Sequence, residues 1–250
     1  MRTLVLLALA FAPVQGREFT EVSAGWEWQG QIARGKSVEI RGVTGDIHAI
    51  PAVNGQVEVL AHVDGDTEPG AVEIRALEHL SGVTICAVRR GASACADDAL
   101  TTPGARVDYT VRVPSGVHLT ARTVNGGIEA ESLASDVDAT TVNGAVIVST
   151  SGTVQAHTVN GSIEASLMKP FWSKSPEFSA VNGKISVKIP TNVQSAVRAE
   201  TRNGKIVTDV PKFRGKATEQ LLDGQIGGAG GCSQMIIRTI NGTIELRQRF

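Results

Sequence analysis

The segment Thr123-Val124-Asn125-Gly126-Gly127-Ile128 indicates the fold most clearly, because variants of it return throughout the C-terminal half of the chain. An Asn-Gly pair marks six copies, and a degenerate seventh copy carries Asp-Gly instead. The pairs are Asn125-Gly126, Asn143-Gly144, Asn160-Gly161, Asn182-Gly183, Asn203-Gly204, Asp223-Gly224 and Asn241-Gly242. Successive copies are separated by 18, 17, 22, 21, 20 and 18 residues. A period of about 20 residues is typical of proteins built from stacked coils.

Alignment of the copies on Asn reveals alternation on both sides of the Asn-Gly pair. The third residue after Asn is aliphatic in every copy: Ile128, Val146, Ile163, Ile185, Ile206 and Ile244. The third residue before Asn is mostly polar: Arg122, Thr140, His157, Ser179, Glu200 and Arg238. Such period-2 alternation predicts two half-buried strands per repeat, joined by a turn. We expect Asn and Gly in this turn because both tolerate positive φ.

Two all-β architectures fit this pattern. Asn-Gly between alternating strands is a strong hairpin signal, which would give an antiparallel meander. A meander, however, does not require the same residue type in the same column of every copy. Stacked coils do require it, because each residue lies about 4.8 Å from its equivalent in the next coil. The sequence therefore favours a parallel β-solenoid of ~20-residue coils with an N-terminal β cap, a filled core and a ladder of stacked Asn side chains.

The N-terminus has the features of a secretory signal peptide. Residues 1–16 contain Arg2, an apolar run over 4–12 and a Val14-Gln15-Gly16 ending suited to cleavage. The run is too short to span a membrane, although a buried strand or core helix is the alternative. No later apolar run reaches about 18 residues, so we expect no membrane span. The protein is therefore predicted to be exported to the periplasm, the cell surface or the medium.

The remaining chain has almost balanced charge, with 23 basic and 25 acidic residues once Arg2 is removed. Without a basic stripe, no nucleic acid partner is expected. Residues 17–114 form a predicted N-terminal β region, and 115–250 form the repeat region, continuous with it. Gly45-Asp46-Ile47 is a weak match to the turn of the repeat. Trp26 and Trp28 share one face of a short strand and either cap the core or offer a platform for sugar stacking.

Three cysteines are present, Cys86, Cys95 and Cys232. In an exported protein the first two most simply form a disulfide that closes a loop-like excursion after the predicted strand over 83–88. Cys232 is then unpaired, although three cysteines allow three different single bridges. The sequence does not choose strictly among these pairings.

Two insertions lengthen individual repeats, at 168–176 and 211–220. Because loops on a rigid scaffold often carry binding residues, Phe171 and Trp172 form the first candidate contact surface. The alternative is that both rings fold back over the flank of the stack.

Motifs for catalysis and for cofactor or metal binding are missing. The five histidines show no metal-ligand spacing, and no Cys-x-x-Cys, phosphate loop or Gly-x-Ser-x-Gly occurs. Glycoside hydrolysis needs two carboxylates about 5–10 Å apart in one cleft. The glutamates Glu129, Glu164 and Glu245 share a column, but apolar residues interrupt it. We therefore expect no enzyme activity, no cofactor and no metal.

The repeats resemble a bacterial family of unknown function that carries the label "putative adhesin". The resemblance rests on the Val-Asn-Gly-x-Ile repeats after a signal peptide, on Gly45-Asp46-Ile47 and on the strands over 83–86 and 107–114. It covers about residues 38–247 and implies a β-solenoid in the cell envelope. No catalytic residues are implied. Arg202 and Asp223 depart from the repeat, so the Asn ladder is expected to be interrupted there.

Three functions are consistent with these features. The first is a non-enzymatic surface-binding protein, with a glycan or a protein of the envelope as its partner. A polysaccharide-processing enzyme on the same scaffold is the second. The third is a structural or stress-sensing envelope protein that self-associates through the ends of the solenoid.

Overall fold

The computed structural model describes residues 25–65, 71–92, 94–96, 100, 104–228 and 233–249. The predicted signal peptide and Cys232 lie outside these ranges. All elements in the described ranges are strands, and they form two sheets. Sheet I has ten strands, in the order β1 (Trp26–Gly30), β4 (Val57–Asp64), β7 (Arg106–Val113), β3 (Ile47–Pro51), β9 (Ile128–Leu133), β11 (Val146–Thr150), β13 (Ile163–Leu167), β15 (Ile185–Ile189), β21 (Ile244–Gln248) and β17 (Ile206–Thr208). Sheet II has eleven, in the order β18 (Phe213–Ala217), β19 (Leu221–Ile226), β16 (Ser195–Asn203), β20 (Gln234–Asn241), β14 (Glu177–Asn182), β12 (Val154–Asn160), β10 (Val137–Asn143), β8 (His118–Arg122), β2 (Ser37–Arg41), β6 (Gly82–Arg89) and β5 (Val72–His79).

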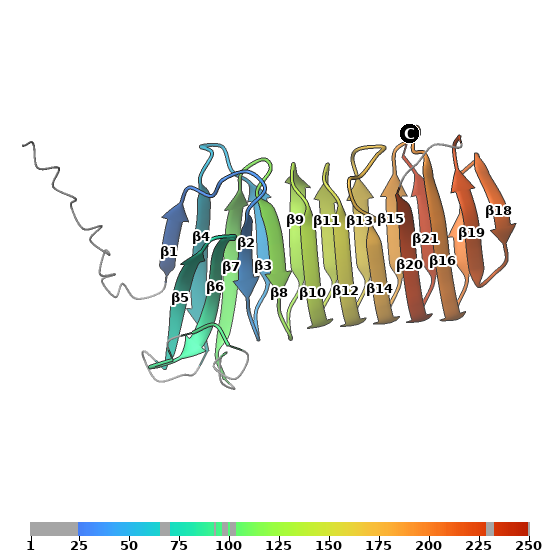
Figure 1. Cartoon of the computed structure of the whole chain (residues 1–250). Helices are drawn as coiled ribbons and strands as arrows, with labels where there is room; N and C mark the ends of the chain where they lie inside the picture. Colours follow the sequence, from blue (N-terminus) through green and yellow to red (C-terminus); the bar gives the residue numbers. More distant parts are fainter. Residues whose placement is uncertain are drawn as a thin grey trace, which may run out of the picture.

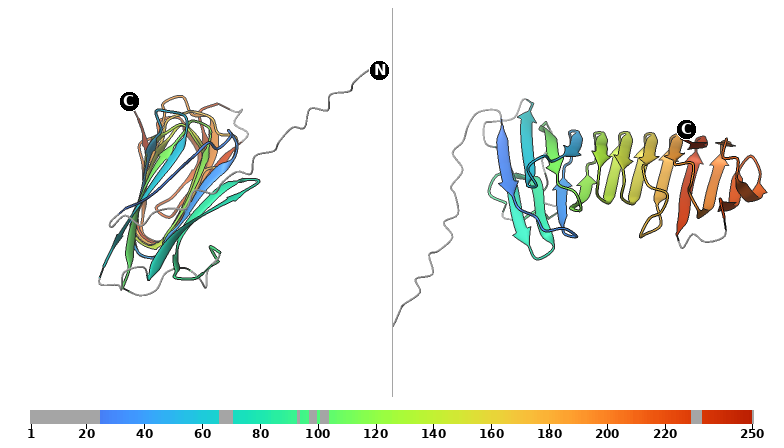
Figure 2. Two further views of the ribbon diagram at one scale, coloured as in Figure 1. Left: turned by 90° about the vertical axis from the view of Figure 1, so that its left-hand side faces the viewer. Right: turned by 90° about the horizontal axis from the view of Figure 1, so that it is seen from above.

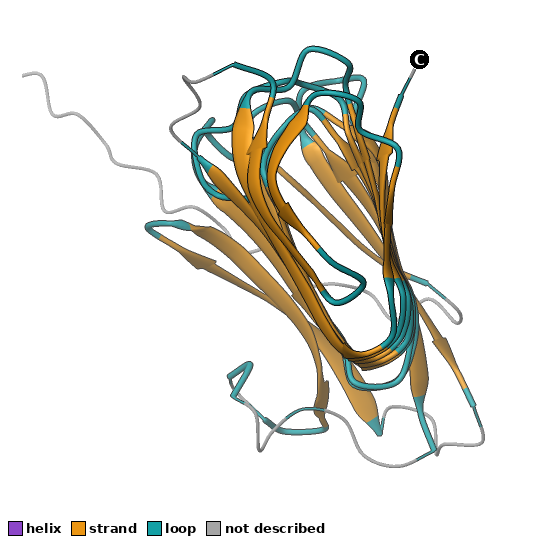
Figure 3. Ribbon diagram, turned by 90° about the vertical axis from the view of Figure 1, so that its right-hand side faces the viewer, coloured by secondary structure: helices purple, strands orange, loops and turns teal. Residues whose placement is uncertain are grey.

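The repeats run parallel, not antiparallel. Each repeat contributes one strand to sheet II and the next to sheet I, and equivalent strands pair in parallel register. The Asn-Gly pairs connect the two strands and pile up along one narrow edge (Figures 1 and 3). Asn143 thus aligns with Asn160, and Asn160 aligns with Asn182. The antiparallel meander is therefore wrong for the repeats, and the prediction of an all-β chain with mostly parallel pairing is confirmed.

Stacked aliphatic side chains fill the space between the sheets. The column of Ile128, Val146, Ile163, Ile185 and Ile244 is almost completely buried, and each side chain lies beside its equivalent in the next strand. Opposite it, the alanines of sheet II allow the two layers to lie close together, and the larger Phe178 and Ile237 are fully buried in the same column. This continuous burial of equivalent apolar side chains against one another is the main source of stability of the stack.

Two hydrogen-bond ladders hold the corners together. Along the exposed ladder, the Nδ2 of every corner Asn after Asn125 donates to the Asn Oδ1 of the neighbouring coil at 2.7–2.9 Å. The second ladder is buried: the Oγ1 of Thr123, Thr141, Thr158, Thr201 and Thr239 donates to a glycine carbonyl of the adjacent coil at 2.9–3.1 Å. The buried threonines are therefore satisfied by backbone and not by each other.

The corner glycines are required for a reason that differs from the predicted one. Neither Asn nor Gly of the six Asn-Gly pairs has positive φ. Instead, a Cβ at Gly144 would lie 1.9 Å from the carbonyl oxygen of Gly126 in the next coil. Equivalent close approaches occur at Gly126, Gly161, Gly183, Gly204 and Gly242. The sequence needs glycine here because the backbones of neighbouring coils touch.

The spatial order of the coils departs from chain order at the C-terminal end. The last coil, β20 and β21, is inserted between the coil of β14 and β15 and the coil of β16 and β17. Asn241 consequently links Asn182 to Asn203. The expected interruption of the Asn ladder is wrong, because Asn203 joins it from the far side of Asn241.

Asp223-Gly224 is not a corner. Both residues lie within β19, which pairs antiparallel with β16 and with β18. Arg198 pairs with the carboxylate of Asp223 at 3.0 Å. The similarity to the repeat misled the sequence analysis here, since this segment forms an antiparallel hairpin that closes the end of the stack.

The N-terminal region belongs to the same two sheets. β2 and β3 lie next to the first repeat, whereas the later strands β6 and β7 lie outside them. Antiparallel strands β1, β4 and β5 complete this end (Figure 2). Trp28 on β1 is buried, as expected of a cap. Cys86 and Cys95 form a disulfide that attaches the segment after β6.

Candidate binding face

The outward face of sheet II carries ordered rows of polar side chains and two hollows. Because the strands are parallel and in register, outward side chains form rows that run along the stack. Three residues before each Asn lies the row of Arg122, Thr140, His157, Ser179, Arg238 and Glu200, in spatial order. Five residues before Asn lies the row of Thr120, Asp138, Gln155, Glu177, Ile236 and Arg198.

Ion pairs between these rows fix many of the charges. Arg238 lies 3.9 Å from Glu177 and 3.5 Å from Glu200. At the other end of the face, the pKa of Glu39 is lowered. Burial alone would raise this pKa, but its effect is smaller than the combined effect of the hydrogen bonds from Arg41 and Thr84 and the charges of Arg41 and Arg122.

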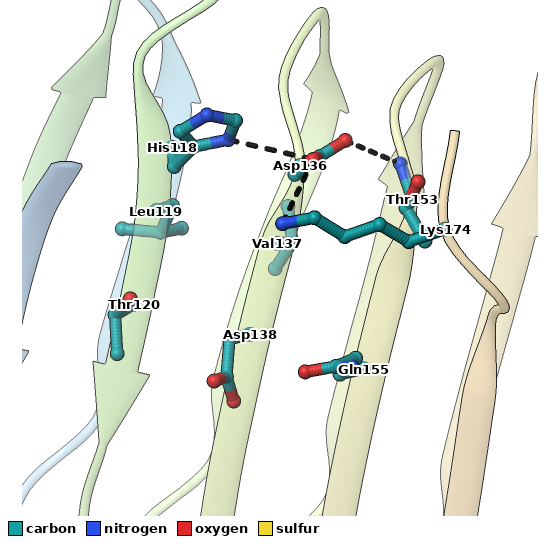
Figure 4. A pocket seen from close by; sticks show the side chains of 9 residues that line it. All are labelled: His118, Leu119, Thr120, Asp136, Val137, Asp138, Thr153, Gln155 and Lys174. Atoms are coloured by element: carbon teal, nitrogen blue, oxygen red, sulfur yellow. Dashed lines mark hydrogen bonds and ion pairs between the residues drawn. The ribbon is translucent and has the colours of Figure 1, made fainter. Parts of the chain in front are cut away.

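The first hollow of this face, the Asp136 pocket, has a volume of about 250 Å³ (Figure 4). Its lining consists of His118, Leu119, Thr120, Asp136, Val137, Asp138, Thr153, Gln155 and Lys174. Asp136 lies at its centre and accepts a 2.8 Å hydrogen bond from the backbone N–H of Thr153. The other carboxylate oxygen lies 3.5 Å from His118 Nδ1 and 3.9 Å from Lys174 Nζ. Three successive coils and the 168–176 insertion thus meet at one carboxylate.

Unused hydrogen-bonding capacity remains in the Asp136 pocket. The Oγ1 of Thr153, a residue only 3% exposed, has no hydrogen-bond partner among the described residues, and neither has Nδ1 of His118. A buried polar group without a partner costs about 1–3 kcal/mol. The accessible side chains of Asp136, Asp138, Gln155 and Lys174 also line this hollow, so it suits a polar group better than an apolar one.

The second hollow, the Arg238 groove, lies on the same face over β14, β20 and β16 and has a volume of about 660 Å³. Arg198, Arg202 and Arg238 line it together with Glu200; ion pairs join Arg198 to Asp223 and Glu200, and Arg238 to Glu177 and Glu200. Apolar side chains of Val181, Ile240 and Leu221 line it as well. The guanidinium groups are the donors best suited to a carboxylate or phosphate ligand.

The predicted contact pair, Phe171 and Trp172, is divided by the structure. Phe171 is 73% exposed, as a contact residue would be. The prediction of Trp172 as a contact residue is wrong, because its side chain is only 9% exposed and packs against the core. The ring folds back over the flank of the stack, where it gains more from burial than from solvent contact. Of this insertion, Lys174 and not Trp172 lines the Asp136 pocket.

One group of potential metal ligands could not be found from sequence spacing. His48, Glu129 and Glu131 bring donor atoms within 4.8 Å of one another on the outward face of sheet I. The signal was present, since aligning Gly45-Asp46-Ile47 with Gly126-Gly127-Ile128 places His48 beside Glu129.

The described ranges contain no helix long and apolar enough to cross a membrane.

Comparisons with known proteins support the fold. No family model matches the chain, and no curated protein does either. A solved structure of a "putative cell adhesion protein" from Clostridium sporogenes is similar, with 9% identity and a TM-score of 0.51 over 90% of this chain and 100% of that one. A "putative adhesin" from Bacteroides fragilis has 8% identity and a TM-score of 0.42, over 90% and 98% of the two chains. At such low identity the Clostridium sporogenes protein shows a shared all-β fold of two largely parallel sheets and nothing about activity.

Proposed function

We propose that the chain is an exported, non-enzymatic binding protein of the cell envelope, an adhesin-like β-solenoid. Residues 1–16 would be removed as a signal peptide, and 17–114 and 115–250 would form one continuous stack. Support for the solenoid comes from the alternation of strands between the sheets and from the aligned Asn corners. Support for export comes from the apolar N-terminal run and the disulfide between Cys86 and Cys95.

The observation that carries a binding role is the presence of two different hollows on one sheet face. The Asp136 pocket offers hydroxyl-binding groups, and the Arg238 groove offers guanidinium groups. The two hollows are centred near β10 and β20, which are three strand spacings apart in the sheet, or about 14 Å. An extended glycan with hydroxyl and carboxylate groups would contact both hollows. We therefore assign an acidic polysaccharide of the envelope or of a neighbouring cell surface as the ligand.

Binding to immobilised acidic and neutral glycans by the untagged, secreted chain tests this function. Arg202→Ala and Lys174→Ala each remove an exposed cation from one hollow, and each is expected to weaken binding at least tenfold. Lys188→Ala, which removes an exposed lysine from the face of sheet I, is the matched control and should change nothing. A lack of saturable binding to any acidic glycan, or equal losses in all three variants, would contradict the proposal.

A polysaccharide-processing enzyme is the second candidate, because Asp136 and Asp138 line one pocket. Both carboxylates have cationic neighbours: Lys174 lies 3.9 Å from Asp136, and Arg122 lies 3.9 Å from Asp138. These contacts occupy both carboxyl groups, whereas glycoside hydrolysis needs two carboxyl groups that face the scissile bond. Reducing-end release from the bound glycan, abolished by Asp138→Asn, would favour the enzyme instead.

Self-association through the ends is the third candidate. The outermost strand of sheet II, β18, carries Arg214 and Lys216, and both side chains are exposed. Charged residues on an edge strand discourage pairing with another edge. We therefore expect a monomer in sedimentation, at a position independent of protein concentration.

A further inference from the structure

A histidine and two glutamates converge on the outward face of sheet I, on the opposite side of the stack from the candidate binding face. His48 on β3 lies directly opposite Glu129 on β9. Glu131 follows two residues later and therefore points to the same side of the sheet. One donor atom from each residue lies within 4.8 Å of the other two. We propose that these three residues form a binding site for a divalent transition-metal ion, with Zn²⁺ as the test ion.

Among the described residues, the ion-pair contacts of these donor atoms are confined to the cluster itself. Nε2 of His48 is shielded from solvent and has no hydrogen-bond partner, and it lies 3.6 Å from Oε1 of Glu131. In the part of the chain that the structure describes, no lysine or arginine lies within 4.0 Å of either glutamate. Two carboxylates side by side repel each other, and a bound cation would relieve that repulsion.

The backbone holds the three side chains in place. β3 is paired on both sides, with β7 and with β9, and β9 is itself paired on both sides, with β3 and with β11. Where β9 pairs with β11, Glu131 and Ser132 together oppose the single residue Ser149, which is a β-bulge. Glu131 lies within this bulge, directly after the last pair between β3 and β9, Ala49 with Ala130. Ligands on rigid strands are positioned more accurately than ligands on loops.

The donor set selects the class of ion. One imidazole nitrogen and two carboxylate oxygens suit Zn²⁺ and its first-row neighbours, whereas Ca²⁺ and Mg²⁺ prefer sites made of oxygen alone. Three protein ligands leave at least one coordination position open toward solvent. A water molecule or an oxygen atom of a bound partner can complete the coordination there.

The repeat supplies a matched control for this site. Glu164 on β13 occupies the same column as Glu129, but its neighbours across the strands are Ile147 and Ser186. The same residue type in the same row therefore lacks a histidine. If repetition of glutamate alone produced ion binding, Glu164 would contribute as much as Glu129.

Calorimetric titration of Zn²⁺ into the untagged chain tests the proposal, with Cys232→Ser in every protein to remove a competing thiol. We expect one ion per chain, at least tenfold weaker binding in His48→Ala and in Glu131→Gln, and unchanged binding in Glu164→Gln. The visible absorption of bound Co²⁺ provides a second measurement that does not depend on stability, and it should disappear only in the two site variants. No saturable uptake of Zn²⁺, or equal uptake by His48→Ala and the parent chain, would overturn the site.

Discussion

Replacement of Gly126 by Ala should destabilise the whole stack, because the corner has no room for a methyl group. A Cβ at this position would lie 1.9 Å from the carbonyl oxygen of Gly45. Ordinary C···O contacts are about 3.3 Å or longer, so the two coils would have to separate by more than about 1 Å. That movement would break the bond from Gly45 N to Asn125 O, now 2.9 Å, and the bond from Thr123 Oγ1 to Gly45 O, now 3.1 Å. With about 1 kcal/mol per bond and about 1–3 kcal/mol for overpacking, Gly126→Ala should cost about 3–5 kcal/mol.

The adjacent glycine is the control, and urea denaturation is the assay. A Cβ at Gly127 would meet its nearest atom at 3.5 Å, and residues with a Cβ occupy this position in the other repeats. Gly127→Ala should therefore be neutral or stabilise the protein by up to about 1 kcal/mol, through the unfolded chain. The two variants should differ in the urea midpoint with the same m-value. If Gly126→Ala stays within about 1 kcal/mol of wild type, or Gly127→Ala is equally harmful, the close approach of the coils is not what requires glycine.

Three further variants test other parts of the account. Tyr109 is 1% exposed, and its hydroxyl has no hydrogen-bond partner among the described residues. Tyr109→Phe should therefore raise the free energy of unfolding by about 1–2 kcal/mol, and a loss of stability would show that the hydroxyl has a partner. Ala180 occupies the position of the threonine of the buried ladder. In Ala180→Thr the new hydroxyl should donate to Gly161 O and raise the free energy of unfolding by about 0.5–1.5 kcal/mol. A large decrease in melting temperature would show that the site lacks space for the threonine side chain. The pKa of Glu39 is lowered from its ordinary value of 4.5, so its contribution is present above that pH and is lost as the pH falls through the lowered pKa. Glu39→Gln should therefore be less stable than wild type at pH 7 and equally stable in strong acid, and a gap that widens in acid would contradict this sign.

Local alternation was sufficient to predict the strands of the repeats and their buried faces. The predicted strands over 83–88 and 107–114 are also present, as β6 and β7. The aliphatic column after Asn indicated the core, because only stacked coils need the same residue type in each copy. The order of the coils could not be predicted in the same way. Since every Asn-Gly corner is compatible with every other, nothing local distinguishes Asn241 from Asn203 as the neighbour of Asn182.

Residues of the candidate sites were harder to predict than the fold. The Asp136 pocket combines three coils and an insertion, and it depends on the alignment of columns that look unrelated in the sequence. Trp172 was misplaced because an aromatic residue in a polar insertion can face either way, and packing against the core decides the direction. His48 was missed because its partners lie 81 and 83 positions away in the chain, beyond the reach of any short spacing rule.

Disulfide trapping across the inserted coil shows whether parallel coils stack in register with the last coil between two earlier ones. In a Cys232→Ser background, Val181→Cys combined with Ile240→Cys places two thiols on neighbouring strands, with Cα atoms about 4.8 Å apart. Val181→Cys combined with Arg202→Cys places them two strands apart, at about 9.6 Å, which is too far for a disulfide. We predict rapid intramolecular oxidation of the first pair and none of the second. Rapid oxidation of the second pair, with the first remaining reduced, would show that the coils stack in chain order and would contradict the account.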